Sequence, residues 1–300
     1  MKVLITGATG LIGNQLTQSL LEIGVKVNYL TTSKEKIVNR EDYKGFYWNP
    51  SKNEIDTAAF NEVTAIIHLV GATIAKRWTK QYKQTILDSR VGTANLLFDT
   101  LQHIDHTITH FISASGISVY PSDKSKLYTE DDPDVANTFL GDVVVAWEKA
   151  ADQFKSLGMR VAKVRTGVVF AEGEGAFEKI KKPIEKGFGA PLGSGEQWIS
   201  WIHLEDIAGC YVHILKHGFQ GVYNAVAPNP VTNKNLTFKI AAALDKNIWL
   251  PNVPSFVLKI VLGEMASLVL ESQLVSSKKI VSAGYNFHFI NPNYLVKKLI

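Results

Sequence analysis

The sequence predicts a doubly wound α/β fold, a parallel sheet covered by helices on both faces, with a smaller mixed lobe toward the C-terminus. First, the N-terminal half alternates short β-branched runs with longer segments of helical periodicity, which is typical of a parallel sheet with crossover helices. Second, several strand segments are apolar almost without alternation, as strands buried on both faces are. Third, a chain of 300 residues approaches the upper size of a single core, so an appended lobe is expected.

The individual elements follow from these patterns in order along the chain. Strands are expected at 2–5, 26–30, 65–70, 109–113 and 160–164. Helices are expected at 11–23, 79–101 and 142–157, where apolar residues recur at helical spacing. Glycine and proline become frequent after residue 165, and a strand at 221–227 and helices at 236–244 and 255–270 are expected beyond them.

This change in composition indicates two interleaved lobes without a clean hinge. We expect residues 1–172 to form the sheet domain, with residues 200–228 returning to it. Residues 173–199 and 229–300 are then expected to form the smaller lobe.

Composition excludes several classes of protein. Thirty-two basic against 28 acidic residues give a formal charge of +4, which is far from the concentrated positive field of a nucleic-acid binder. One cysteine, Cys210, excludes an internal disulfide and a thiolate metal cage, and no histidine cluster has metal-site spacing. The apolar run 253–270 contains Lys259 and Glu264, so it is no membrane span, and no signal peptide is evident. We expect a cytoplasmic monomer or homodimer that takes a small-molecule substrate and binds neither nucleic acid nor membrane.

The strongest chemical signal is the glycine-rich loop between the first strand and the first helix. Gly7 allows a sharp turn, Gly10 allows the backbone to approach a diphosphate, and Gly13 allows the helix to pack closely on the strand. The unpaired N–H groups at the helix start then face the phosphates. The alternative is a tight turn that binds no ligand. The expected contacts are Gly7, Thr9, Gly10, Leu11, Ile12 and Gly13.

The end of the second strand indicates which dinucleotide is bound. An acidic residue there holds the ribose 2′-hydroxyl of NAD, whereas cations and hydroxyls suit the 2′-phosphate of NADP. The chain has Thr32, Ser33 and Lys34 at this place and no acid at the strand end, which favours NADP. The alternative is a polar loop with a helix cap, because serine and threonine are common N-caps.

Several motifs carry a family resemblance. The glycine spacing, the run His68–Ala72 and the run Phe111–Ser115 resemble the extended short-chain dehydrogenase/reductase superfamily. Four further runs resemble its atypical bacterial subgroup named epimerase family protein, which is sugar-nucleotide-epimerase-like and has a C-terminal domain of unknown function. These runs are 88–91, 129–133, 192–203 and 224–232. The resemblance implies a Rossmann domain, a nicotinamide cofactor contacted also by Leu69, Val70 and Gly71, and a substrate lobe.

The catalytic residues that the resemblance implies are only partly present. Members of the superfamily use a serine with a tyrosine and a lysine four residues apart on one helix face. Ser115 matches the serine, with Ser113 as runner-up, but the helix has Val144 and Glu148 at the other two positions. Glu148 is expected to accept a hydrogen bond from the nicotinamide ribose. Tyr120 is the best remaining phenol, and its alternative is a packed ring with a wet tip.

The substrate lobe offers four candidate ligand contacts. Arg165, Gln197, Trp198 and Asn224 combine charge, amides and an aromatic ring, although a packed corner explains the tryptophan equally well. Lys163 lies in a predicted strand, where its side chain can point outward. No arginine follows Arg165 to clamp a diphosphate, so a small carbonyl compound is as plausible a substrate as a nucleotide sugar.

Two functions therefore remain open. The first is an NADP(H)-preferring oxidoreductase or epimerase-like protein that acts on a small carbonyl or sugar-derived substrate. The second is a non-catalytic NADP(H)-binding or sensing protein, which the replacement of the tyrosine and lysine by Val144 and Glu148 favours.

Overall fold

A single eight-stranded sheet organises the protein. The computed structural model describes residues 1–300, and the strand order is β12-β8-β6-β5-β1-β2-β3-β4. All neighbouring strands are parallel except β3 and β4, which confirms the predicted fold class. The strands are β1 (Lys2–Thr6), β2 (Lys26–Thr31), β3 (Tyr43–Asn49), β4 (Glu54–Ile55), β5 (Ala65–His68), β6 (His110–Gly116), β8 (Arg160–Thr166) and β12 (Gly221–Ala225).

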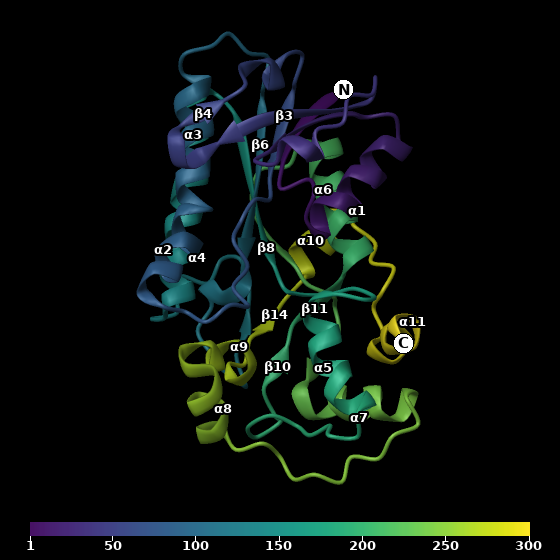
Figure 1. The fold of residues 1–300 in the computed structure, drawn as a ribbon. Helices are drawn as coiled ribbons and strands as arrows, with labels where there is room; N and C mark the ends of the chain where they lie inside the picture. Colours follow the sequence, from purple (N-terminus) through teal and green to yellow (C-terminus); the bar gives the residue numbers. More distant parts are fainter.

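Helices cover both faces of this sheet (Figure 1). Helices α1 (Leu11–Glu22) and α6 (Leu204–His217) pack together on one face, over a core of 26 buried residues. The other face carries α2 (Lys80–Asp88), α3 (Val91–Leu101) and α4 (Phe139–Asp152), and α3 and α4 share a core of 18 buried residues with the sheet. None of the helices combines the length and the hydropathy that crossing a bilayer requires.

Three differences from the expected elements concern helices α2 to α4 and strands β3 and β4. The helix expected at 79–101 is divided into α2 and α3 by a turn at Ser89 and Arg90, and the Arg90 side chain donates to the Ile86 and Ala72 carbonyls. The helix expected at 142–157 begins earlier, where Thr138 caps α4, and ends as the 3₁₀ segment Gln153–Leu157. Strands β3 and β4 were missed because β3 is a half-exposed, polar and aromatic segment without a clear period.

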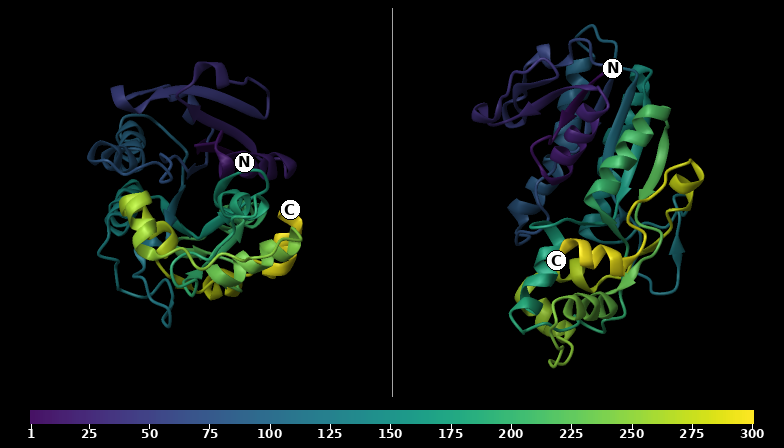
Figure 2. Two further views of the ribbon diagram at one scale, coloured as in Figure 1. Left: turned by 60° about the horizontal axis from the view of Figure 1, so that its bottom comes forward. Right: turned by 90° about the vertical axis from the view of Figure 1, so that its right-hand side faces the viewer.

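The smaller lobe lies beyond the carboxyl ends of the parallel strands (Figures 1 and 2). Helices α5 (Gly175–Glu185), α7 (Asn233–Ala243) and α11 (Pro292–Leu299) share a core of 13 buried residues there. The helix expected at 255–270 is interrupted at Gly263, whose φ of 59° is left-handed. It therefore forms α8 (Ser255–Leu262), the 3₁₀ turn η6 (Gly263–Ala266) and α9 (Ser267–Leu270). Two short strand pairs are β9 (Val168–Phe170) with β11 (Trp201–His203) and β10 (Trp198–Ile199) with β13 (Val231–Thr232).

Part of the C-terminal segment returns to the sheet domain, which differs from the expectation that all of 229–300 belongs to the smaller lobe. After β14 (Leu274–Val275), which pairs with β7 (Leu127–Tyr128), helix α10 (Lys278–Ser282) packs against β12. Ile280 and Tyr285 lie in the same buried core as α1 and α6. The Tyr285 hydroxyl donates to the Asp206 carboxylate over 3.1 Å, which fixes this return.

The carboxyl edge of the sheet is where the chain reverses its direction of winding. The chain proceeds from β1 outward to β2 and β3, and then begins again on the other side of β1 with β5, β6 and β8. In open parallel sheets, ligands bind at such a switch point. Strand register also places Ser115, Arg165 and Asn224 in one row across β6, β8 and β12 near this edge.

Candidate cofactor and substrate site

The glycine loop between β1 and α1 has the geometry of a close-packed cradle. Gly7 has a φ of 75°, and a Cβ there would lie 3.0 Å from the backbone nitrogen of Val70. A Cβ at Gly13 would overlap the Gly7 carbonyl oxygen and lie 2.7 Å from the Cα of Ala8. The loop thus packs against the segment after β5, which contains Leu69, Val70 and Gly71. A side chain at Gly7 would push the loop away from Leu69 and Val70, and a side chain at Gly13 would push α1 away from Gly7 and Ala8.

The start of α1 presents free backbone donors to this cradle. Gly10 is the N-cap and supplies no side-chain cap, while the N–H groups of Leu11 and Ile12 have no acceptor in the chain. Thr9 is exposed at the tip of the loop. Unpaired N–H groups and the positive end of a helix dipole form an anion site, so these residues fit a dinucleotide diphosphate.

The end of β2 carries a free cation. The Lys34 ammonium lies 5.0 Å from the centre of the Tyr47 ring and forms no ion pair. Thr32 is exposed beside it. Ser33 donates its hydroxyl to Glu35, so this hydroxyl is less available for a ligand than we expected. The end of β2 therefore suits a phosphate through Lys34 and Thr32.

Beyond β5, a buried histidine and a buried arginine support the loop at 69–72. His68 bonds the Thr6 hydroxyl over 2.9 Å, and burial lowers its pKa to about 4, so it is neutral at physiological pH. Arg90 donates to the Ala72 carbonyl and lies 5.0 Å from the centre of the Trp147 ring. Burial lowers the pKa of Arg90 to about 10, and no carboxylate pairs with it. We missed Arg90 although the run 88–91 contains it.

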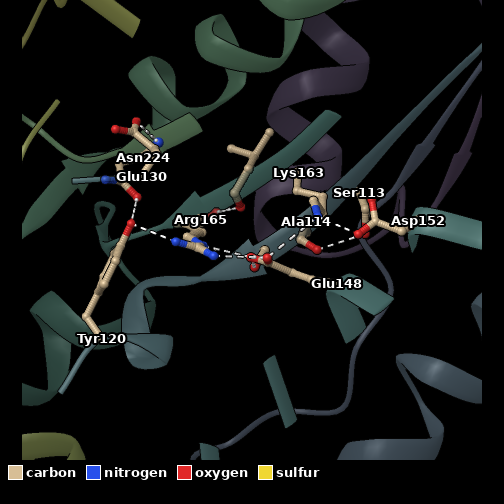
Figure 3. A network of polar contacts seen from close by, with 12 residues as sticks. Ser113, Ala114, Tyr120, Glu130, Glu148, Asp152, Lys163, Arg165 and Asn224 are labelled. Atoms are coloured by element: carbon tan, nitrogen blue, oxygen red, sulfur yellow. Dashed lines mark hydrogen bonds and ion pairs between the residues drawn. The ribbon is translucent and has the colours of Figure 1, made fainter. Parts of the chain in front are cut away.

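A buried ion pair occupies the end of β6, where the catalytic pair was sought. Arg165 binds Glu148 through two contacts, from Nε to Oε1 over 2.8 Å and from Nη2 to Oε2 over 3.0 Å (Figure 3). Ser115 donates its hydroxyl to the same carboxylate over 2.6 Å. Both charged side chains are 11% exposed. Burial opposes the charge of Arg165, but bonding to Glu148 outweighs it and raises the pKa of Arg165.

Lys163 also joins this group, which contradicts the expectation that it points outward. Its ammonium donates to Asp152 over 2.8 Å and lies 3.8 Å from Glu148 (Figure 3). The reason is that β8 lies under α4, and two carboxylates of this helix, Glu148 and Asp152, face the strand. Ser113 lies deeper, with its hydroxyl bonded to the Ala114 carbonyl.

Tyr120 is part of the same network but is sealed from solvent. Its side chain has zero exposure, its hydroxyl donates to Asn224 over 2.8 Å, and it accepts from Arg165 over 2.9 Å. Burial raises its pKa, and the neighbouring Arg165 only partly offsets this. Asn224 is held in turn by Glu130, which accepts from its backbone N–H over 2.7 Å and which we missed within the run 129–133. The structure thus links Tyr120 to Ser115 only through Arg165 and Glu148.

Val144, the residue expected at the position of the usual tyrosine, is buried. It lies in a cluster of seven buried residues that also contains Tyr120, Tyr128 and Val226. Beside it, the Ser118 hydroxyl has no hydrogen-bond partner and lies 3.4 Å from where a Cβ on Gly116 would be. Ser118 is therefore a free hydroxyl in the 3₁₀ turn that follows β6 (Ile117–Val119), and sequence reasoning missed it.

Gln197 and Trp198 lie in a separate corner of the smaller lobe. Gln197 is buried, and its amide donates to the carbonyls of Leu192 and Val269, while its oxygen has no donor. The Trp198 indole donates to the Lys124 carbonyl. Gln273 connects this corner to the network, since it bonds the carbonyls of Trp198 and Tyr120. The nearby Trp201 fills core, as the packed-corner alternative predicts for this run.

Two adjoining cavities lie at the α8–α9 segment, and only the smaller one is shared with the sheet domain. The larger, of about 480 Å³, is formed by α8, η6 and α9. The smaller, of about 260 Å³, lies between α9 and the starts of α2 and α4. Residues Glu264, Ser267 and Glu271 line both cavities, while Trp78, Thr138, Phe139 and Leu140 line only the smaller.

Comparisons with known proteins agree with this architecture. The family model described as NAD dependent epimerase/dehydratase family matches residues 3–226, and a domain of unknown function, DUF1731, matches residues 253–293. An epimerase family protein of Staphylococcus aureus is 33% identical over 300 residues, with 99% of this chain and 98% of the relative covered. The structure of human epimerase family protein SDR39U1 (isoform 2) with NADPH has a TM-score of 0.86 at 29% identity, covering 100% of this chain and 99% of the other. UDP-glucuronic acid 4-epimerase of Bacillus cereus shares the fold at 16% identity, with a TM-score of 0.79 and coverage of 100% and 98%.

Proposed function

Because the chain belongs to the NAD dependent epimerase/dehydratase family, we propose that it binds NADP(H) and acts as an oxidoreductase or epimerase-like enzyme on a small carbonyl or sugar-derived substrate. The observation that carries this proposal is the glycine cradle at the switch point of the sheet, with free N–H groups on Leu11 and Ile12. The NADPH bound to the human relative supports the same cofactor class.

In this proposal the residues that contact the cofactor lie in a row along the carboxyl edge of the sheet. Adjacent strands are about 4.8 Å apart, so β2, β1, β5 and β6 span roughly 15 Å, which suits an extended dinucleotide. Lys34 and Thr32 hold the 2′-phosphate, the Gly7–Gly13 loop holds the diphosphate, and Leu69, Val70 and Gly71 close over it. The Glu148 carboxylate then accepts from a nicotinamide ribose hydroxyl, because Arg165 and Ser115 fix its position. The bound nicotinamide supplies the hydride chemistry.

Ser115 and Tyr120 have different roles in this proposal. Ser115 lies at the carboxyl edge, where it orients Glu148 and can exchange this bond for one to a substrate oxygen. Tyr120 has no exposure, so it acts as a positioning residue that holds Arg165 and Asn224 in place. Ser118 offers a free hydroxyl close to Gly116 and Val144 and can donate to a substrate oxygen. Gln197 and Trp198 stay candidate substrate contacts, although they line neither of the two cavities.

The cofactor preference can be tested with one charge reversal. Fluorescence titration of the purified chain is expected to show NADPH binding about tenfold more tightly than NADH, since one phosphate contact to a cation contributes that much. Lys34→Glu should remove most of this gap. Lys52→Glu, on an exposed turn after β3, is the matched control and should leave the gap unchanged. Equal affinities of the wild type for the two cofactors would refute the preference.

A non-catalytic binding or sensing role is the second candidate, favoured by Val144 and by the Glu148–Arg165 pair. Neither group can supply the acid that a tyrosine–lysine pair provides. Oxidation of NADPH over a panel of carbonyl compounds, measured beside cofactor binding, separates the two candidates. Turnover of any compound that Ser118→Ala slows supports the enzyme. Tight binding without turnover across the panel supports the second candidate.

A further inference from the structure

The smaller of the two cavities has an unusual balance of charge. Its only charged lining residues are Glu264 and Glu271, and no arginine or lysine lines it. Glu264 is paired with Lys83 of α2, whereas Glu271 forms no ion pair and no side-chain hydrogen bond. Burial raises the pKa of Glu271, as expected of a carboxyl group that has lost water without gaining a partner.

The aromatic wall of this cavity already suits a cation. Trp78 and Phe139 meet edge to face at 5.2 Å, and the Lys83 ammonium lies 5.0 Å from the centre of the Phe139 ring. Trp78 lines the cavity, and neither lysine nor arginine pairs with its ring. An ammonium group between the Trp78 face and Glu271 would gain both a cation–π contact and a charge-assisted hydrogen bond.

One face of α4 runs from the cavity toward the proposed cofactor end. Leu140 lines the cavity, and Val144 and Glu148 follow on the same face at intervals of four residues. Each interval advances about 6 Å along the helix. Leu140 beside the cavity and Glu148 at the proposed nicotinamide end therefore lie roughly 12 Å apart along the helix, with Val144 buried between them.

We propose that the substrate is an amine-bearing, cationic carbonyl compound or alcohol, with its ammonium group held by Glu271 and Trp78, and that nucleoside diphosphates are excluded. This proposal rests on the proposed function for the position of the reacting end, but not for the charge selection. A diphosphate in this cavity would face two carboxylates, and the arginine that usually clamps one is missing from its walls. Two cations lie nearby: Lys83 is committed to Glu264, and Lys259 lines only the larger cavity and forms no ion pair.

Binding of three probes to the full chain tests the charge selection. We would titrate p-(aminomethyl)benzyl alcohol, p-(hydroxymethyl)benzoate and uridine diphosphate by calorimetry, with and without NADPH. The amine is expected to bind at least about tenfold more tightly than the carboxylate, and this preference should weaken as salt is added. Glu271→Gln should remove the preference, whereas Glu54→Gln, at an exposed position on β4 at the opposite end of the molecule, should not (Figure 1).

A charge reversal distinguishes a ligand site from a structural role. Glu271→Lys should invert the preference, so that the carboxylate binds more tightly than the amine, which a merely destabilised lobe would not produce. Equal binding of amine and carboxylate, tighter binding of uridine diphosphate, or no binding of any probe at about 10 mM would each overturn the proposal. NADPH titration of the same samples reports on the proposed function separately. Loss of NADPH binding with the amine preference intact would refute only the cofactor role.

Discussion

Replacing Gly13 by alanine should separate cofactor binding from helix stability. Alanine favours a helix over glycine by about 1 kcal/mol, so α1 alone would gain stability. At this position, however, the new Cβ would overlap the Gly7 carbonyl oxygen and lie 2.7 Å from the Ala8 Cα, where only backbone can give way. Overpacking of this kind costs about 1–3 kcal/mol, so we expect a net loss of about 1 kcal/mol.

The larger effect of Gly13→Ala should be on the affinity for NADPH. Relief of the overlap moves the loop away from the start of α1, which displaces the donors on Leu11 and Ile12. Loss of one charge-assisted hydrogen bond, at about 1.5–3 kcal/mol, weakens binding at least about tenfold.

A matched glycine in a helix provides the control. Gly92 lies in α3, and the nearest atom to a Cβ there is the Asp88 Cβ at 4.0 Å. Gly92→Ala should therefore stabilise the protein by up to about 1 kcal/mol and leave NADPH affinity unchanged. Urea unfolding and fluorescence titration measure the two quantities on the same samples. Wild-type NADPH affinity in Gly13→Ala would refute the assignment of this loop to the diphosphate.

Two further predictions concern buried charges. Arg165→Met should cost about 3 kcal/mol in the free energy of unfolding, because it leaves the buried Glu148 carboxylate with only the Lys163 ammonium at 3.8 Å. The double variant with Glu148→Gln should recover part of this loss, and a single variant as stable as wild type in urea would contradict the prediction. His68, whose pKa burial lowers from 6.5 to about 4, should make the protein less stable as pH falls from 6.5 to 4, because the unfolded chain then binds the proton that the folded chain excludes. This contribution of His68 is fully present above pH 6.5 and amounts to about 3 kcal/mol. The free energy of unfolding should therefore fall less between pH 6.5 and 4 in the His68→Gln variant than in the wild type. Parallel pH profiles of the two proteins would refute this role of His68.

The sheet and its loop could be predicted because local sequence determines them. Buried parallel strands such as β1 and β5 are continuous apolar runs, and the glycines at 7, 10 and 13 have few alternative explanations beside a strand and a helix. Strand β3 could not be predicted in the same way. Its pairing with β2 is a tertiary contact, and its half-exposed residues lack a period that would indicate it.

The candidate site was predictable as a set of residues but not as a set of bonds. Ser115, Arg165 and Asn224 were singled out separately, and the strand register that places them in one row cannot be read from any one segment. Tyr120 was selected as the best remaining phenol because it follows Ser115 closely along the chain. Its burial depends on Asn224, more than 100 residues away, and on the packing of β7 and β14. Glu271 and Trp78 were missed for the same reason, since the cavity that unites them exists only between the lobes.

The two departures from the superfamily pattern on α4 are physically linked. A glutamate at the position of the usual lysine would be an unpaired buried charge, and it is tolerated because β8 places Arg165 and Lys163 beneath it. That arginine then needs a second acceptor, which the Tyr120 hydroxyl supplies from inside the core. With the cation committed to Glu148, no group remains to lower the pKa of a phenol at position 144, and valine packs there instead. The substitution Val144→Tyr alone should therefore not produce a phenol with a lowered pKa, since the lysine partner at position 148 would still be absent.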